Sequence, residues 1–156
     1  MTSNERYEKF LEMMRLIIRS KDLINCYENI PRTYGSPDIL YQGECHTIQA
    51  IGDDPEISIT EIAKQMNKTK SASSQLIDRL VRKGFVLKSP SPHNNRSCVL
   101  SLTPLGEQVY QFHKKFDSES YHSILESLSQ FSLEDLETFI QIQTAINQKL
   151  EENTHL

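Results

Sequence analysis

The sequence predicts a mainly α-helical fold with one small β-hairpin. Over most of the chain, apolar residues recur at the three- and four-residue spacing of helices that bury one face. Residues 85–102 differ, because short apolar runs there flank a segment rich in Pro, Asn and Ser, which indicates two strands joined by a long loop. With 156 residues, we expect a single domain over residues 1–156.

The first two helices are predicted over residues 4–28 and 44–52. The apolar stripe of the first consists of Tyr7, Phe10, Leu11, Met14, Ile17 and Ile18. Prolines and glycines between residues 31 and 43 interrupt the helical pattern and indicate a loop. The second helix is expected to end at Asp53, which is followed by Asp54 and Pro55.

Residues 57–84 predict two further helices joined by a tight turn. Ser58 and Glu61 have the spacing of a capping box, so a helix should begin there. Thr69 is the expected N-cap of the next helix, and Gly84 is its expected stop. This next helix is expected to bury Ala72, Leu76, Leu80 and Val81. With the hairpin that follows, residues 44–103 are predicted to be a helix-turn-helix with a β-wing.

Two long helices are predicted after the wing. Thr103 and Pro104 match an N-cap followed by proline at the first helical position, and this helix should extend to about residue 129. Ser132 and Asp135 have capping-box spacing at the start of the last helix, whose apolar stripe reaches Leu150. The terminal segments therefore contain amphipathic helices that a helix-turn-helix does not need for reading DNA.

Residues 64–96 have the charge of a nucleic-acid-binding surface. They contain eight Lys or Arg and one Asp, which gives this segment a net charge of +7. The whole chain has a net charge of −4, so the remaining residues together have a net charge of −11. A basic block on an acidic chain is typical of phosphate binding. The residues expected to contact DNA are Lys68, Lys70, Ser71, Ser73, Ser74, Gln75, Arg79, Arg82, Lys88 and Arg96.

These residues have different expected roles. Gln75 and Arg79 can make paired hydrogen bonds to base edges, and the small serines allow a close approach to the groove. The lysines and Arg82 are expected at phosphates, and Arg96, near the wing tip, in a minor groove. An ordinary solvated helix face and a surface loop with one solvated Arg are the alternatives.

Residues 57–106, which end in Leu102-Thr-Pro-Leu-Gly106, resemble the winged helix-turn-helix of MarR-family transcription regulators. The order of features carries the resemblance: a helix, a recognition helix ending in Lys-Gly, a wing with an Arg near its tip, and Leu-Thr-x-x-Gly opening a long helix. Asn94 is a departure, because the family usually has Asp two positions before the wing Arg, and an amide lacks the charge that would orient Arg96 strongly.

The resemblance also implies how the protein acts. It implies a sequence-specific DNA-binding regulator, a repressor in our interpretation, that forms a two-fold homodimer through residues 1–30 and 104–152. The partner is then double-stranded DNA with a pseudo-palindromic operator, because the two recognition helices lie about one DNA turn apart. A monomer with a helical cap is the alternative.

Glu44, His46, His113 and Asp117 are candidate zinc ligands. His113 and Asp117 are four residues apart on one helix and share a face, and imidazole and carboxylate groups bind zinc. Glu44 and His46 are two apart, so a regular helix would not aim both inward. The arrangement is similar to that of zinc-responsive MarR regulators, although those carry additional histidines on the long helix, where Asp117 stands at one such position.

The sequence also leaves two alternatives to zinc as the effector, an oxidant and a small organic ligand. Cys26, near the end of the first helix, is a candidate redox sensor, but a lone cysteine is more often an inert buried thiol. A small aromatic or acidic ligand has no sequence signature. The histidines and acidic residues at the candidate zinc site also fit ordinary polar residues at a helix junction.

The sequence also argues against several classes of protein. It lacks a Gly-rich phosphate loop and the G-x-S-x-G and H-E-x-x-H motifs, so we do not expect an enzyme. No apolar run approaches the roughly 18 residues of a membrane span, and no signal-peptide pattern opens the chain. Three cysteines without C-x-x-C spacing predict a reduced, cytoplasmic protein. A winged-helix protein-interaction module and a non-specific architectural DNA binder are the alternative functions.

Overall fold

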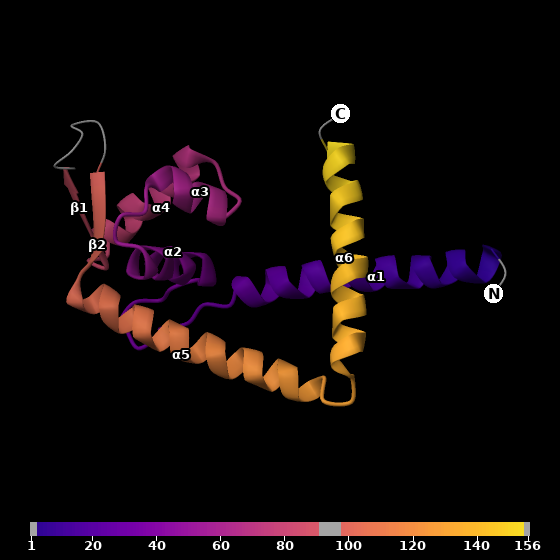
Figure 1. The fold of residues 1–156 in the computed structure, drawn as a ribbon. Helices are drawn as coiled ribbons and strands as arrows, with labels where there is room; N and C mark the ends of the chain where they lie inside the picture. The colour runs from indigo at the N-terminus through magenta and orange to yellow at the C-terminus, as the bar shows by residue number, and fades with distance from the viewer. Residues whose placement is uncertain (1–2, 91–97, 155–156) are drawn as a thin grey trace. The chain divides into compact units, whose positions relative to one another are not determined.

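The structure is a computed structural model that describes residues 3–90 and 98–154 (Figure 1). Its elements are α1 (Ser3–Glu28), α2 (Gln42–Asp53), α3 (Ile59–Gln65), α4 (Lys70–Arg82), β1 (Val86–Pro90), β2 (Cys98–Leu102), α5 (Pro104–Ser127) and α6 (Leu133–Thr154). This order confirms the predicted mainly helical fold, in which a two-stranded wing follows the helix-turn-helix of α3 and α4.

The chain divides into two compact units, Met1–Lys115 and Phe116–Leu156. The boundary falls inside α5, which is continuous across it. The expected organisation as one domain over residues 1–156, with residues 44–103 as its DNA-binding part, stays a prediction. In the described part of the chain, no helix is long and apolar enough to cross a membrane.

The core of the first unit lies among α2, α3, α4 and the wing. Its buried side chains include Leu40, Ile48, Ile62, Ile77, Leu80, Phe85 and Leu100. The strands pair antiparallel, with Val86 opposite Leu102. Burial of each large apolar side chain stabilises the fold by about 1.5–3 kcal/mol. Packing on this core therefore gives α4 a fixed orientation beside the wing.

Hydrogen-bonded caps determine where the short helices begin and end. The Ser58 hydroxyl accepts the Glu61 N–H at 3.2 Å, and the Glu61 carboxylate accepts the Ser58 N–H at 2.8 Å. The hydrogen bonds from Ser58 lower the pKa of Glu61 below its ordinary value. The Thr69 hydroxyl accepts the Ala72 N–H at 3.1 Å. Gly84, with φ of 77°, follows the end of α4 in the left-handed conformation, so all these predicted boundaries are confirmed.

The buried face of α4 is rotated from the expected one. Ser73, Leu76, Ile77 and Leu80 are buried, whereas Ala72 is exposed. The expectation that Ala72 faces the core is wrong, because the stripe is centred between Leu76 and Ile77 and Ser73 lies one turn before both. The polar residue at position 73 therefore lies inside and the apolar one at 72 lies outside.

Gly106 allows α5 to begin close to the wing. The Thr103 hydroxyl donates to the Gly84 carbonyl at 2.6 Å and accepts the Gly106 N–H at 3.0 Å, which confirms Thr103 as the N-cap. A Cβ at position 106 would lie only 2.0 Å from the Phe85 carbonyl oxygen. Glycine is therefore required for this approach between α5 and the residue that opens the wing.

A polar cluster joins the end of α2 to α5. The Tyr110 hydroxyl donates to the Asp53 carboxylate at 2.6 Å and accepts from the Lys114 ammonium at 3.1 Å. The hydroxyl of Tyr110 is the main cause of the lowered pKa of Asp53. These contacts keep the segment of α5 around His113 beside α2.

The second unit contains the end of α5 and helix α6. The Ser132 hydroxyl accepts the Asp135 N–H at 3.1 Å, and the Asp135 carboxylate accepts the Ser132 N–H at 2.8 Å, which confirms the predicted start of the last helix. Along α6 no residue is buried. Among its apolar side chains, Phe139 is 60% exposed and Ile140 is 61% exposed in the single chain.

Candidate nucleic-acid interface and metal site

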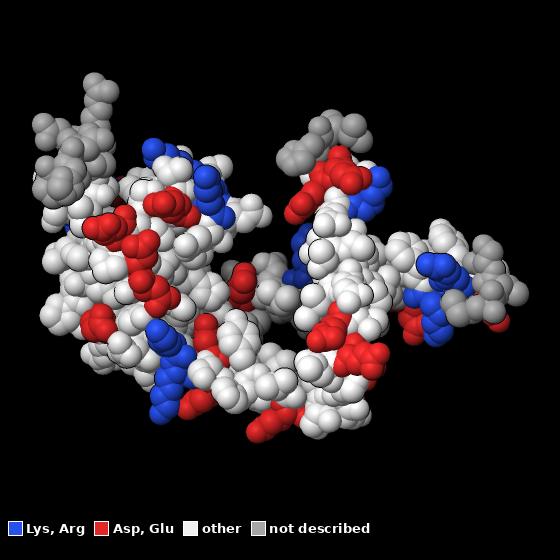
Figure 2. Space-filling view, in the orientation of Figure 1, with Lys and Arg blue, Asp and Glu red and all other residues white. Residues whose placement is uncertain are grey.

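Helix α4 presents a polar and basic face opposite its buried stripe. Ser71, Gln75 and Arg82 are exposed, and their steps of four and seven residues place them along one side of the helix. Figure 2 shows Lys and Arg side chains over the region of α3 and α4, with acidic side chains nearby. This combination of short, amide and cationic side chains suits both base edges and phosphates.

The structure places most candidate DNA contacts at the surface. The exposed ones are Lys68, Lys70, Ser71, Gln75, Arg79, Arg82 and Lys88, and Ser74 is half-buried. The expectation that Ser73 contacts DNA is wrong. Only 1% of Ser73 is exposed, because its side chain lies on the face of α4 that packs on the core. Arg96 and Asn94 lie outside the described residues, so the expected role of Arg96 stays a prediction.

Two acidic residues hold basic residues of this surface. The Lys88 ammonium lies 3.0 Å from the Asp78 carboxylate of α4. On α2, one carboxylate oxygen of Glu44 lies 2.9 Å from the Lys83 ammonium and 3.8 Å from Nε of Arg79. Sequence reasoning missed the Glu44 contacts because Glu44 and Lys83 are 39 residues apart and no local pattern connects them.

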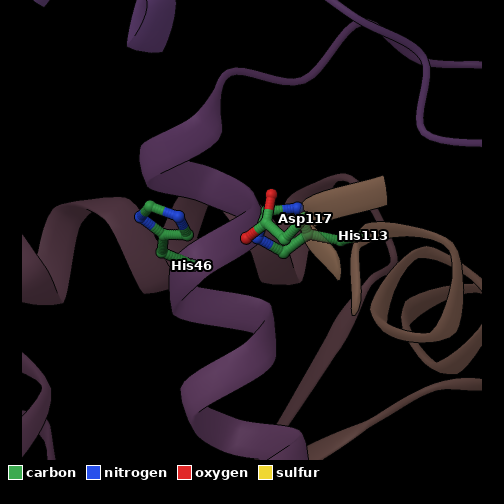
Figure 3. Close-up of side chains that lie close together, drawn as sticks. All are labelled: His46, His113 and Asp117. Atoms are coloured by element: carbon green, nitrogen blue, oxygen red, sulfur yellow. The ribbon is translucent and has the colours of Figure 1, made fainter. Parts of the chain in front are cut away.

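His46, His113 and Asp117 form a cluster with the donor types of a metal site (Figure 3). The two imidazole rings have centroids 5.2 Å apart, and the potential ligand atoms of all three residues lie within 4.8 Å of one another. His113 is fully buried, and the other two are half-buried. Asp117 lies one turn beyond His113 on α5, as the spacing predicted.

Neighbouring side chains orient the two histidines. Tyr34 packs edge to face on His113, with ring centroids 5.3 Å apart. Burial raises the pKa of Tyr34 above its ordinary value. The amide nitrogen of Gln42 lies 3.3 Å from Nε2 of His46, in hydrogen-bonding distance. An amide N–H that donates to this nitrogen occupies its lone pair, so a metal bound at Nε2 would have to displace Gln42.

Glu44 is not brought to this cluster. Its carboxylate accepts the Tyr41 N–H at 3.0 Å and binds the Lys83 ammonium at 2.9 Å. Residues two apart on a helix point about 200° apart, so Glu44 faces α4 while His46 faces α5. Of the four candidate ligands, the structure gathers the two histidines and Asp117. Cys26 is exposed at the end of α1.

A known protein family matches the segment that contains the helix-turn-helix. The family model of the MarR family matches residues 40–98, which include α2, α3, α4 and β1. Residues 40–98 form a MarR-family domain. The predicted resemblance is therefore confirmed over the segment that carries the exposed face of α4.

Relatives of the chain extend the likeness beyond the matched segment. The HTH-type transcriptional regulator YhjH of Bacillus subtilis (strain 168) is 24% identical over 140 residues, which are 86% of this chain and 80% of that protein. Streptococcus pneumoniae FabT, solved in complex with DNA, is 25% identical with a TM-score of 0.67, and the alignment covers 94% of this chain and 98% of FabT. Lactococcus lactis ZitR, a zinc-responsive MarR family member, shares the fold at 15% identity and a TM-score of 0.66, over 96% and 99% of the two chains.

These matches establish the class of function. The MarR-family domain and the related proteins are those of DNA-binding transcriptional regulators. The expectation that the chain is not an enzyme is confirmed, because the matched family and the related proteins are transcriptional regulators. The exposed residues of α4 and the wing are therefore the candidate DNA-reading surface of a regulator.

Proposed function

We propose that the protein is a sequence-specific repressor that binds a pseudo-palindromic operator as a homodimer. The observation that carries the proposal is the exposed polar and basic face of α4, held rigidly beside the wing by a packed core. In this arrangement α4 enters the major groove. A regulator of this kind acts where the DNA is, so we keep a cytoplasmic location as part of the proposal.

The exposed face divides into base-reading and phosphate-binding residues. Gln75 lies in the middle of the outward side of α4, and its amide can donate to and accept from one adenine edge. Ser71 lies one turn before it and leaves room for a close approach. Lys68, Lys70 and Arg82 lie at the two ends of α4 or just before it, where long cationic side chains suit phosphates.

Exposed apolar side chains support the homodimer. On α1, Leu16, Ile18, Leu23 and Ile24 are each 58–59% exposed, and α6 has no buried residue. Monomeric proteins rarely leave such extensive apolar helix faces in water. We propose that residues 1–30 and 104–152 bury these faces against a second copy of the chain, which gives two copies of α4 for the two halves of an operator.

Two other functions make different predictions about DNA. A protein-interaction module has no need of the net charge of +7 over residues 64–96 and would bind DNA weakly at every salt concentration. An architectural DNA binder would bind all sequences about equally, and its affinity would fall with salt. Only the proposed repressor enriches one sequence from random double-stranded DNA. We call the most strongly enriched sequence the reference duplex.

The change Gln75→Ala tests base reading by α4. Loss of a paired hydrogen bond to one base should weaken binding to the reference duplex by about 1–3 kcal/mol and relax discrimination at one base pair of each half-site. Binding to a scrambled duplex should stay the same, because the charge does not change. Fluorescence anisotropy on both duplexes measures this, with Gln130→Ala, at an exposed position between α5 and α6, as the control. Equal weakening on both duplexes would show that Gln75 reads no base.

Zinc is the effector that we propose for the cluster of His46, His113 and Asp117. Two imidazole nitrogens and one carboxylate oxygen are a common zinc donor set, and their spacing within 4.8 Å is one that side-chain rotation can close. Bound zinc would supply a positive charge that fixes these three side chains together. The zinc-responsive ZitR shows the same fold, and at 15% identity it supports the fold alone, so the proposal depends on the residues themselves.

Asp117→Asn tests the metal site. Loss of a charged ligand should weaken zinc binding by at least about tenfold, and His46→Ala should weaken it further. Competition with a chromophoric chelator measures zinc affinity directly, and Glu126→Gln, an exposed position on the same helix, is the control for charge. Wild-type zinc affinity in both ligand variants would remove zinc from the proposal and leave an organic ligand or oxidation of Cys26 as the effector.

A further inference from the structure

We infer that Glu44 is a positioning residue for sequence discrimination, which acts by restraining Arg79 on the recognition helix α4 and Lys83 at the C-cap of this helix. The inference rests on the proposed function, since it requires that α4 reads DNA. Sequence discrimination is the ratio between the affinity of the protein for its own DNA site and its affinity for other sequences.

The carboxylate of Glu44 is held from two directions. One oxygen accepts the Tyr41 N–H at 3.0 Å, at the start of α2. The other lies 2.9 Å from the Lys83 ammonium, which also donates to the Ile39 carbonyl at 3.2 Å. The side chain of Glu44 is only 6% exposed. The carboxylate is therefore a fixed negative charge that binds the end of α4 to α2.

The contact with Arg79 differs in strength from the contact with Lys83. Nε of Arg79 lies 3.8 Å from the same oxygen, and 53% of the Arg79 side chain is exposed. An ion pair of this length and exposure is weak. Glu44 and Arg79 also line a cavity of about 350 Å³ beside Lys68, which leaves room for the guanidinium to move. Arg79 is therefore attracted to Glu44 but remains able to leave it for DNA.

This arrangement opposes non-specific binding. A cation that is free to extend neutralises phosphates of any sequence, and each such contact strengthens binding independently of sequence. The fixed charge of Glu44 offsets two cations of the basic surface and limits the orientations of Arg79. Binding to a well-matched operator gains enough free energy to break the weak contact between Arg79 and Glu44. Binding to a poorly matched sequence gains less free energy when this contact breaks.

Glu44→Gln tests the inference with the full chain, the reference duplex and a scrambled duplex. We expect binding to the scrambled duplex to become about three- to tenfold tighter, and the ratio of affinities between the two duplexes to fall by a similar factor. The slope of log affinity against log salt on the scrambled duplex should become steeper by about one, because one more phosphate is neutralised. In an Arg79→Ala background, Glu44→Gln should change the affinity ratio much less, since its partner is absent.

The controls separate positioning from simple charge and from folding. Glu56→Gln removes the same charge at an exposed position between α2 and α3, outside the proposed dimer segments and DNA contacts, and should leave the affinity ratio unchanged. Glu44→Asp keeps the charge and should retain most of the discrimination. If Glu44→Gln does not fold, Lys83→Gln replaces it as the test, because it removes one cation and leaves the Glu44 carboxylate to Arg79 alone. An affinity ratio equal to or above that of the wild type, at a wild-type unfolding midpoint, then supports the restraint, and a lower ratio overturns it. An unchanged ratio in folded Glu44→Gln, or equal weakening on both duplexes, overturns the inference. If wild-type protein enriches no sequence, the proposed function itself fails, and this inference fails with it.

Discussion

Replacing Ile140 by Glu should leave the single chain folded and weaken its binding to the reference duplex by about 100-fold or more. Ile140 is 61% exposed, and α6 has no buried residue, so the fold of one chain does not depend on this side chain. In the proposed homodimer the new carboxylate would be buried without a partner, which is costly. A separated monomer loses the advantage of two linked binding sites, which is worth roughly 10²–10⁴ in affinity.

Three measurements check this prediction. Sedimentation equilibrium should show a dimer for the wild type and a monomer for Ile140→Glu, circular dichroism should show equal helix content, and anisotropy should show the loss of affinity. Gln141→Glu places the same charge on the neighbouring, exposed position and is the matched control. A dimeric Ile140→Glu protein that binds the reference duplex normally would show that this face of α6 is not at the dimer interface.

Gly106→Ala should cause the largest loss of folding stability, about 3 kcal/mol or more. The added Cβ would lie 2.0 Å from the Phe85 carbonyl oxygen, and neither backbone can move without disturbing the first turn of α5 or the wing. The Thr103 hydrogen bonds to Gly84 and Gly106 would be strained by the same movement. Weakened DNA binding should follow, because the wing is attached through this junction.

Urea unfolding of the two proteins measures this loss. The matched control is Gly43→Ala in α2, where a Cβ would lie 3.4 Å from the flexible end of Lys68, and φ lies outside the left-handed region. There the better helix propensity of alanine should leave stability unchanged or raise it slightly. If Gly106→Ala unfolds at the wild-type urea concentration, the close approach of α5 to the wing is not as described.

Features with short-range causes were predictable from the sequence. The caps at Ser58, Thr69, Thr103 and Ser132 depend on residues three positions away, so their spacing alone located the starts of four helices. The side-by-side placement of His113 and Asp117 follows from one helical turn in the same way.

Features with long-range causes were not predictable. Tyr34 lies in a loop that composition identified, but nothing local indicated that it is 2% exposed and packs on His113. The phase of α4 was misjudged because Ala72 and Ser73 are both small, and the packing of α4 on the rest of the core selects which one is buried. The ion pairs of Glu44 form only after α2 packs on α4.

The central claim is that two copies of α4, one from each chain of a homodimer, read a specific DNA sequence. Selection of the full-length protein on random double-stranded DNA tests it most directly, because the enriched sequence reports both specificity and symmetry. We predict an enriched site with two inverted half-sites whose centres lie about 10 base pairs apart, one turn of the DNA helix. Enrichment of no sequence, or of a site without two-fold symmetry, would contradict the claim.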